Sequence, residues 1–288
     1  MKVRKILFPT DLSPESEAAK NFAKVLAKKH GAELLLLHEV LTHAHDFRQL
    51  GDLLTDFLDK LEADARARLE EECKGLKNAG LVASCIVERN PSAYEAIKDK
   101  IEEWEPDVVV MGTHGRSGVD RWIVGSVAEK IVRHAPVPVV TVRSDAKPVS
   151  KIDKILVPVD FSDNSRRAVA AAAQLKGTKG SLGLLHVVLN PAFAGLHPEE
   201  YIRVFGVDPS LPDRLRDRMK DWMEGQPFEA DVREADDVAD CILQATREKK
   251  PDLVVMGTRG LTGLDYFLMG SVAEKVVRFS PVAVLCVK

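Results

Sequence analysis

Two matching stretches decide the fold: EPDVVVMGTHGRSGVDRWIVGSVAEKIVRHAPVPVVTVR at residues 105–143 and KPDLVVMGTRGLTGLDYFLMGSVAEKVVRFSPVAVLCVK at residues 250–288. They align without a gap and are identical at more than half of their positions. The starts of the two halves repeat as well, with KILFPTDLSPES at 5–16 matching KILVPVDFSDNS at 154–165. A repeat whose period is about half of the chain predicts two whole domains of one fold.

The 288 residues are enough for two domains of ordinary size. The polar stretch SDAKPVSK at 144–151 contains Pro148 and is typical of a linker. We therefore predict one domain at residues 1–146 and a second at residues 147–288.

Short apolar runs alternate with segments of helical periodicity in both halves. In the first half the strand-like runs are 5–10, 33–40, 82–88, 107–112 and 137–142. The first helix is expected to start with Ser13 as N-cap and Pro14 in its first turn, and to end at Gly31. This alternation predicts an α/β fold in each domain, a five-stranded parallel sheet sandwiched by helices.

Ligands of such sheets bind beyond the carboxyl ends of the strands, near the point where the strand order reverses. Two glycine loops, GTHGRSGVDRWIVGS (112–126) and GTRGLTGLDYFLMGS (257–271), each follow a strand and precede a helix. The first two glycines of each loop are expected to take positive φ and to let the backbone approach a ligand. Gly125 and Ser126 come directly before a helix, whose unpaired N–H groups and dipole favour an anion. The pattern predicts a phosphate site in each domain.

The loop spacing, with its two glycines, nine further residues and a final Gly-Ser pair, resembles the signature of the universal stress protein family. The openings KILFPTDLS and KILVPVDFS are similar to that family's first strand, so the resemblance covers essentially the whole chain. It implies a tandem member with an adenine nucleotide alpha hydrolase-like, Rossmann-like fold in each domain. Because members with the complete glycine motif bind ATP, it also implies ATP as cofactor, with Mg²⁺ as its candidate companion ion. The implied function is nucleotide-dependent regulation in a stress response, with at most slow ATP hydrolysis or self-phosphorylation.

The residues that match the family's ATP site by position recur in both domains. In the first, the nucleoside would contact Pro9, Thr10, Asp11 and Val40, and the phosphates would contact Gly112, His114, Gly115, Gly125, Ser126 and Val127. In the second, the matches are Pro158, Val159, Asp160 and Val188 for the nucleoside and Gly257, Arg259, Gly260, Gly270, Ser271 and Val272 for the phosphates. Met111 and Met256, which precede the two loops, complete the sets.

The two copies differ in ways that affect binding. Thr10 is replaced by Val159, and His114 by Arg259, which adds a permanent positive charge near the phosphates. We therefore expect two sites of unequal affinity.

Some of these residues have plainer interpretations. Asp11 and Asp160 could cap the helices that follow them, and capping does not exclude a contact with ribose. His38 and His186 are expected to pack or to form hydrogen bonds rather than to bind a ligand.

No catalytic residues are predicted. The chain has neither GxxxxGK[ST] nor GxGxxG, and no Ser-His-Asp set can be assembled from it. Two alternatives to an ATP-binding regulator stay open: an interaction module that binds no nucleotide in one or both domains, and an ATP-using transferase on a related fold. The HIGH-like or SGGxDS-like motifs of such transferases are absent from the sequence.

Composition limits the partners and the location. A net charge of −3 argues against nucleic acid, and no apolar run approaches the ~20 residues that span a bilayer. The four cysteines form no CxxC pair, which is typical of reduced thiols in a cytoplasmic protein. His43 and His45 are expected in a solvated loop, and no metal site made of side chains is predicted.

The last strand of each domain, at 137–142 and 282–287, is expected at a sheet edge, which invites pairing. The family resemblance implies that these strands pair the two domains within one chain. Further homodimerisation stays open.

Overall fold

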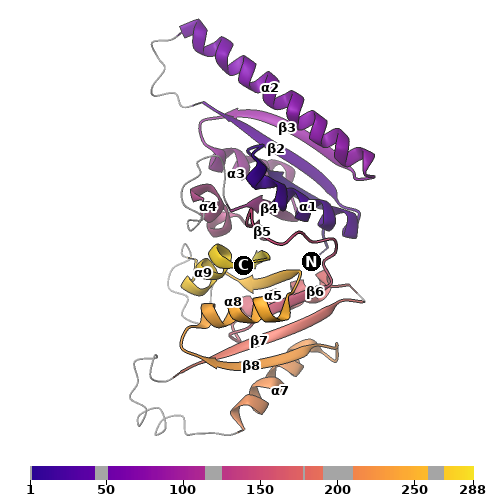
Figure 1. Cartoon of the computed structure of the whole chain (residues 1–288), viewed down its shortest axis with the longest axis vertical. Helices are drawn as coiled ribbons and strands as arrows, with labels where there is room; N and C mark the ends of the chain where they lie inside the picture. The colour runs from indigo at the N-terminus through magenta and orange to yellow at the C-terminus, as the bar shows by residue number, and fades with distance from the viewer. Residues whose placement is uncertain (1, 43–50, 114–124, 178, 191–209, 259–268) are drawn as a thin grey trace. The chain divides into compact units, whose positions relative to one another are not determined.

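The structure is a computed structural model that describes residues 2–42, 51–113, 125–177, 179–190, 210–258 and 269–288 (Figure 1). It consists of two compact units, Met1–Lys151 and Ile152–Lys288, and each is described by itself. The domain boundary predicted between residues 146 and 147 stays a prediction.

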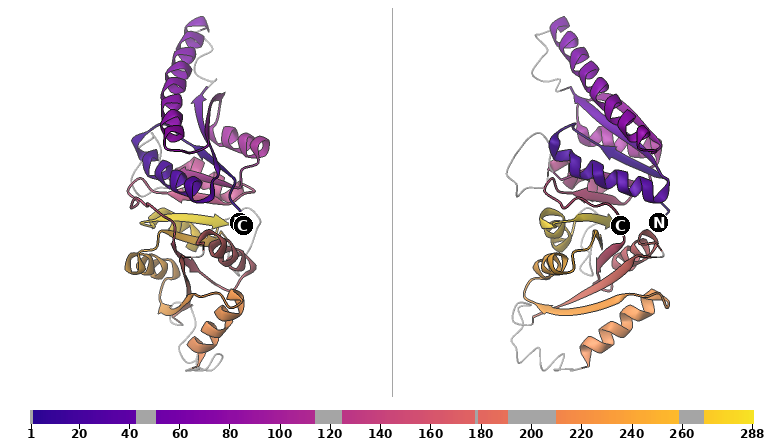
Figure 2. Two further views of the ribbon diagram at one scale, coloured as in Figure 1. Left: turned by 90° about the vertical axis from the view of Figure 1, so that its right-hand side faces the viewer. Right: turned by 45° about the vertical axis from the view of Figure 1, so that its right-hand side comes forward.

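The first unit alternates strands and helices as predicted. Its elements are β1 (Lys5–Pro9), η1 (Pro14–Ser16), α1 (Glu17–His30), β2 (Glu33–Leu41), α2 (Gly51–Asn78), β3 (Ala83–Asn90), α3 (Ala93–Trp104), β4 (Val108–Gly112), α4 (Ser126–His134) and β5 (Val139–Val142). Every strand pairing in it is parallel, and the strand order is β3-β2-β1-β4-β5. α1 and α2 cover one face of the sheet, and α3 covers the other with α4 packed beside it (Figure 2). The predicted fold class is confirmed.

β1 and β2 have continuous apolar sequences because both of their faces are buried. Leu7 and Phe8 on β1 and Leu34 and Leu36 on β2 are fully buried. Helices cover both faces of the sheet, so side chains that point to either side lie in the core. Phe22 of α1 is buried on one of these faces.

The second unit repeats the first. Its described elements are β6 (Lys154–Pro158), α5 (Asp163–Leu175), β7 (Ser181–Leu189), α7 (Leu211–Met223), β8 (Glu229–Ala235), α8 (Val238–Lys249), β9 (Leu253–Gly257), α9 (Ser271–Phe279) and β10 (Ala283–Val287). The parallel order β8-β7-β6-β9-β10 corresponds strand by strand to that of the first unit. In both units the order reverses beside the first strand, so the position at which a ligand is expected to bind occurs twice.

The start of the first helix differs from the prediction. Ser13 and Pro14 begin a short 3-10 turn, η1, and α1 starts only at Glu17. The Ser13 side chain does not cap this turn, because its hydroxyl donates to the Asp11 carboxylate. At the other end, Gly31 adopts φ 62° and closes α1 as predicted.

An aspartate before β4 fastens the first strand to the sheet. Asp107 Oδ2 accepts hydrogen bonds from the backbone N–H groups of Arg4 and Lys5, at 2.6 and 2.9 Å. Asp252 makes the same pair of bonds at the start of β6, at 2.9 and 2.8 Å. The clamp fixes the position of β1 and β6, whose other ends carry the candidate site.

We expect Asp107→Ala to lower the free energy of unfolding of the first unit by about 1 to 2 kcal/mol, because two hydrogen bonds to a carboxylate are lost. Urea denaturation measures the change. Asp99→Ala, at an exposed position on α3, is the control and should shift stability by less than about 0.5 kcal/mol. Equal urea midpoints for the two variants would contradict a stabilising role of the clamp.

Candidate functional site

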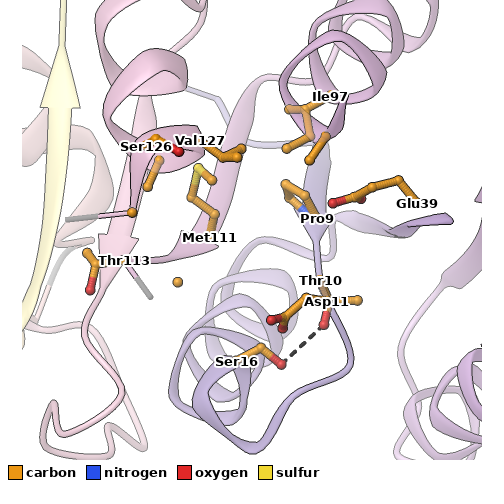
Figure 3. A pocket seen from close by; sticks show the side chains of 14 residues that line it. Pro9, Thr10, Asp11, Ser16, Glu39, Ile97, Met111, Thr113, Ser126 and Val127 are labelled. Carbon is orange, nitrogen blue, oxygen red and sulfur yellow. Dashed lines mark hydrogen bonds between the residues drawn. The ribbon is translucent and has the colours of Figure 1, made fainter. Parts of the chain in front are cut away.

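A cleft opens in the first unit where the neighbouring strands β1 and β4 end (Figure 3). The end of β2, the loop after β1 and the first turns of α3 and α4 complete its wall. The lining residues are Pro9, Thr10, Asp11, Ser16, Glu39, Ala93, Ile97, Met111, Gly112, Thr113, Gly125, Ser126, Val127 and Ala128. The cleft therefore lies at the carboxyl ends of the strands, where the strand order reverses.

Side chains of the loop after β1 hold it in shape. Asp11 Oδ1 accepts hydrogen bonds from the backbone N–H and the hydroxyl of Ser13, at 3.1 and 2.6 Å. Leu12, between them, has φ 59°, a value that few residues other than glycine adopt. The Thr10 hydroxyl donates to Ser16 Oγ at 3.1 Å. These bonds keep Asp11 at the cleft. Asp11 Oδ1 stabilises the loop through Ser13.

Gly125 joins the start of α4 to the end of β4. Its N–H donates to the Thr113 carbonyl oxygen at 2.7 Å, and a Cβ at this position would lie 3.2 Å from that oxygen. Its φ is −57°, so the missing Cβ permits a close approach to Thr113, and no left-handed backbone is involved. Gly112 ends β4 without a positive φ, so the expected positive φ is wrong for this residue. Both glycines line the cleft.

The cleft brings together most of the residues predicted for the first site. Those that line it are Pro9, Thr10, Asp11, Met111, Gly112, Gly125, Ser126 and Val127. Val40 is buried on β2 and is not among the lining residues, whereas its neighbour Glu39 is. His114 and Gly115 lie outside the described residues, as do His43 and His45.

Several lining residues were not predicted from the sequence. They are Ser16, Glu39, Ala93, Ile97, Thr113 and Ala128. The spacing of Ala93 and Ile97 places them on one face of α3, a signal that the sequence does contain. Glu39 follows from strand alternation once His38 and Val40 are assigned to the opposite face. Ser16 had no signal, because its position depends on the 3-10 turn.

The second unit repeats the backbone of this region. The matching bonds are Thr10 N–H to Leu37 O (2.8 Å) with Val159 N–H to Leu185 O (2.8 Å), and Gly125 N–H to Thr113 O (2.7 Å) with Gly270 N–H to Thr258 O (2.9 Å). The predicted residues at the ends of β6, β7 and β9 and at the start of α9 are Pro158, Val159, Asp160, Val188, Met256, Gly257, Gly270, Ser271 and Val272. Arg259 and Gly260 lie outside the described residues.

Side chains around the matching position are less polar in the second unit. Alignment of the repeats replaces Thr10 by Val159, Glu39 by Val187 and Ala93 by Val238. A hydroxyl and a carboxylate are lost, and the first turn of α8 gains a bulkier side chain. The cleft of the first unit and the matching region of the second therefore have the same backbone but differ in the polarity of their side chains.

Histidines at the second strand of each unit support the loop. His38 Nδ1 and His186 Nδ1 each lie 2.7 Å from a carbonyl oxygen, of Thr10 and Val159 respectively, which confirms their hydrogen-bonding role. Burial lowers the pKa of His186.

In the second unit the loop after the first strand carries an aromatic cluster. Phe161, with φ 64°, packs against the His186 ring at a centroid distance of 4.8 Å and against Trp222 at 5.4 Å. The Arg218 guanidinium carbon lies 4.3 Å from the centre of the Phe161 ring. In the first unit Leu12 takes the place of Phe161, and Arg68 of α2 donates to its carbonyl oxygen at 2.8 Å. One loop conformation is thus fastened in two different ways.

The carboxylate of Asp160 accepts hydrogen bonds from Ser162 in the same loop, and these bonds affect its pKa. Burial raises the pKa of Asp160, but hydrogen bonds from the hydroxyl and backbone N–H of Ser162 outweigh it, and the net pKa is lowered. Ser162 Oγ in turn accepts from the Ser165 N–H and caps α5. Ser162, and not Asp160, therefore caps α5.

Two further features are absent from the described residues. They contain no group of three or more His, Cys, Asp or Glu side chains that could hold a metal ion. None of the helices among them is long and apolar enough to cross a membrane.

The fold and the cleft define a two-domain α/β protein of the Rossmann-like, nucleotide-hydrolase-like class. The sequence model of the universal stress protein family matches the chain twice, at residues 2–143 and 151–288. The chain belongs to the universal stress protein family, as a tandem member.

Individual relatives agree with this assignment. A universal stress protein from Mycolicibacterium smegmatis is 25% identical over 306 residues, which cover 98% of this chain and 96% of that protein. One from Methanocaldococcus jannaschii is 28% identical over 155 residues, 49% of this chain and 94% of its own length. The crystal structure of a universal stress protein from Archaeoglobus fulgidus superposes with a TM-score of 0.71 at 25% identity, covering 99% of this chain and 96% of that one.

We expect Ser162→Ala to raise the pKa of Asp160 toward its ordinary value of 3.8, because the hydroxyl bond is lost. A carboxyl whose pKa is lowered by folding stabilises the protein above its unfolded pKa, and this stability is lost as the pH falls through the folded pKa. The destabilisation by Ser162→Ala should therefore be larger at about pH 6 than below about pH 3. NMR titration of the Asp160 carboxyl carbon and urea denaturation at both pH values measure the two effects.

The control is Ser162→Ala in an Asp160→Asn background. There the Ser162 hydroxyl loses its capping bond to the Ser165 N–H and its bond to the neutral amide at position 160. Neither bond involves a group that titrates in this range, so the cost should be the same at both pH values. An Asp160 pKa that does not move in Ser162→Ala would refute the assignment.

Proposed function

We propose that this chain is an ATP-binding regulator of a stress response, with one adenine nucleotide site in each domain. The observation that carries the proposal is the cleft of the first unit, where the end of β1, the end of β4 and the start of α4 meet. Most of the residues that match the family's ATP site by position line this one cleft.

The start of α4 suits a phosphate group. α4 begins at Ser126, and the first N–H groups of a helix have no partner within the helix. Together with the helix dipole they favour an anion, and Gly125 keeps the approach open. The Ser126 side chain is exposed and can donate a further hydrogen bond. In this proposal the phosphates contact Gly112, Gly125, Ser126 and Val127.

The opposite part of the cleft suits a nucleoside. Pro9 and Met111 offer apolar surface to a base, and the Asp11 carboxylate accepts hydrogen bonds such as those from ribose hydroxyls. Val40 is buried on β2 beside Glu39 and does not line the cleft, so its predicted contact with the nucleoside is not part of this proposal.

The second site is proposed to be weaker for the nucleoside. Val159, Val187 and Val238 replace polar or smaller residues there. Arg259, outside the described residues, adds a cation for the phosphates, so the affinities of the two sites are expected to differ. An interaction module that binds no nucleotide in the second domain is the alternative that these valines favour.

Catalysis is not part of the proposal beyond slow hydrolysis. Among the described lining residues there are two carboxylates, Asp11 and Glu39, and no lysine or arginine. Phosphoryl transfer depends on a cationic clamp, which these side chains do not supply. Mg²⁺, if it accompanies ATP, would take most of its ligands from phosphate oxygens and water, and Asp11 is the carboxylate beside them.

We also propose that the two domains pair through β5 and β10, each the end strand of its own five-stranded order. Taken alone, each domain leaves one edge of that strand bare, and bare edges favour pairing. Binding of ATP would then regulate self-association or association with a protein partner, including a homodimer. Nucleic acid and membranes are not proposed as partners.

A cytoplasmic location is proposed from the cysteines. All four have free thiols, and burial raises the pKa of the Cys286 thiol to about 12. Such thiols are structural and are kept reduced in the cytoplasm.

Denaturing the purified chain should release an adenine nucleotide that mass spectrometry identifies. If the chain purifies without nucleotide, millimolar MgATP should raise its melting temperature, because a ligand that binds only the folded state stabilises it. The double variant Ser126→Glu, Ser271→Glu is the control and should show neither effect. The proposal fails if the natural chain also shows neither.

Single variants should separate the two sites. Ser126 and Ser271 are exposed first residues of α4 and α9, where glutamate is well tolerated but repels phosphate. We expect Ser126→Glu to weaken ATP binding at the first site at least about tenfold and to leave the second unchanged, with the reverse for Ser271→Glu. Isothermal titration calorimetry measures both dissociation constants. Equal constants for the two remaining sites would contradict the proposed difference in affinity.

A further inference from the structure

The two ends of the first unit's cleft differ in charge. At one end lies the start of α4, which favours anions. At the other end Glu39, near the end of β2, lines the cleft, and Figure 3 shows its carboxylate turned toward Pro9. The lining residues between these ends include Pro9, Met111 and Val127, which are apolar.

The sheet keeps these ends apart. β2 and β4 lie on opposite sides of β1, and neighbouring strands are about 4.8 Å apart. Glu39 is therefore about 10 Å from the end of β4 in the plane of the sheet. A nucleotide with its phosphates at α4 would reach toward Glu39 with its base.

Neighbouring charges add to the negative potential at this end. Glu88 of β3 is paired directly with Glu39 in the strand register. The buried Lys100 of α3 lies 2.7 Å from Glu88 and 2.5 Å from Glu103. Two carboxylates thus flank one ammonium group, and Glu39 is a third carboxylate on the strand beside Glu88. The excess of negative charge among these residues disfavours a phosphate here and favours an N–H donor.

The second unit lacks this arrangement. Val187 stands in place of Glu39, and Ala245 in place of Lys100. Arg233, at the position of Glu88, is paired with Asp231 at 3.0 Å and with Glu248 at 2.8 Å. The acidic residues at the Glu39 end of the cleft are therefore a feature of the first unit. The second unit has the same fold without them.

We propose that Glu39 accepts a hydrogen bond from the exocyclic amino group of the bound base and makes the first site selective for adenine. An ionised carboxylate only accepts hydrogen bonds, and the 6-amino group of adenine donates them. A purine without this group leaves the half-buried carboxylate without that bond, which lowers affinity. The inference rests on the proposed nucleotide function and adds a specificity-determining residue to it.

The test compares ATP with purine riboside triphosphate, which differs only by the absent 6-amino group. The full chain carries Ser271→Glu, so that binding to the first site is measured. Calorimetry should give a preference for ATP of about tenfold or more. Glu39→Val, which introduces the residue of the second unit, should reduce this ratio to about 1, and Glu39→Gln, which keeps an acceptor oxygen, should retain most of it.

Glu88→Gln is the matched control. It removes a neighbouring carboxylate from the same face but not the proposed acceptor, so the ratio should persist. A ratio that falls as much in Glu88→Gln as in Glu39→Val would assign the effect to the general potential and overturn the inference.

Further outcomes separate this inference from the proposed function. A preference for ATP that survives Glu39→Val overturns the role of Glu39 while nucleotide binding stands. Tighter binding of GTP than of ATP overturns the adenine assignment, because guanine also offers N–H donors to a carboxylate. If ATP does not bind the first site of the Ser271→Glu chain, whose fold circular dichroism verifies, the proposed function and this inference fail together.

Discussion

The hydrogen bond from the Gly125 N–H to the Thr113 carbonyl oxygen determines where α4 begins relative to β4. It holds the first turn of that helix at the carboxyl edge of the sheet, beside the loop that Asp11 and Ser13 organise. The contact leaves little room for a side chain, so the glycine and the position of the helix end depend on each other. The same bond recurs between Gly270 and Thr258. The anion-attracting end of each unit follows from this one contact.

Much of the fold could be predicted from the sequence because its signals are local or repeated. Continuous apolar runs identified the central strands, and Gly31 identified the end of α1. The start of α1 could not be predicted from Ser13 and Pro14 alone. The choice of Ser13 between capping a helix and bonding Asp11 depends on the loop geometry, which becomes visible only in three dimensions.

Only some of the residues that line the cleft could be predicted from the sequence. The glycine motif and the first strand located Asp11 and Ser126, but Glu39 lies outside both. Its place in the wall of the cleft depends on how β2, β1 and α3 pack together. The repeat gave no hint of it either, because the aligned residue of the second half is the apolar Val187. The positive φ expected for Gly112 was wrong, whereas the close approach of its backbone to a ligand stays a prediction, since a glycine in sequence does not reveal which of the two is required.

Leu12 and Phe161 have φ values of 59° and 64°, and the loop around each is fastened by different neighbours. The left-handed region is most costly for side chains that branch at Cβ, and neither leucine nor phenylalanine branches there. The backbone at this position therefore selects against side chains that branch at Cβ but does not restrict the size of the side chain. Exchange of one unbranched apolar residue for another therefore lets the loop pack differently against α2 in the first unit and against α7 in the second. Valine or isoleucine at either position would bring the loop itself into conflict with the bonds that Asp11 and Asp160 make.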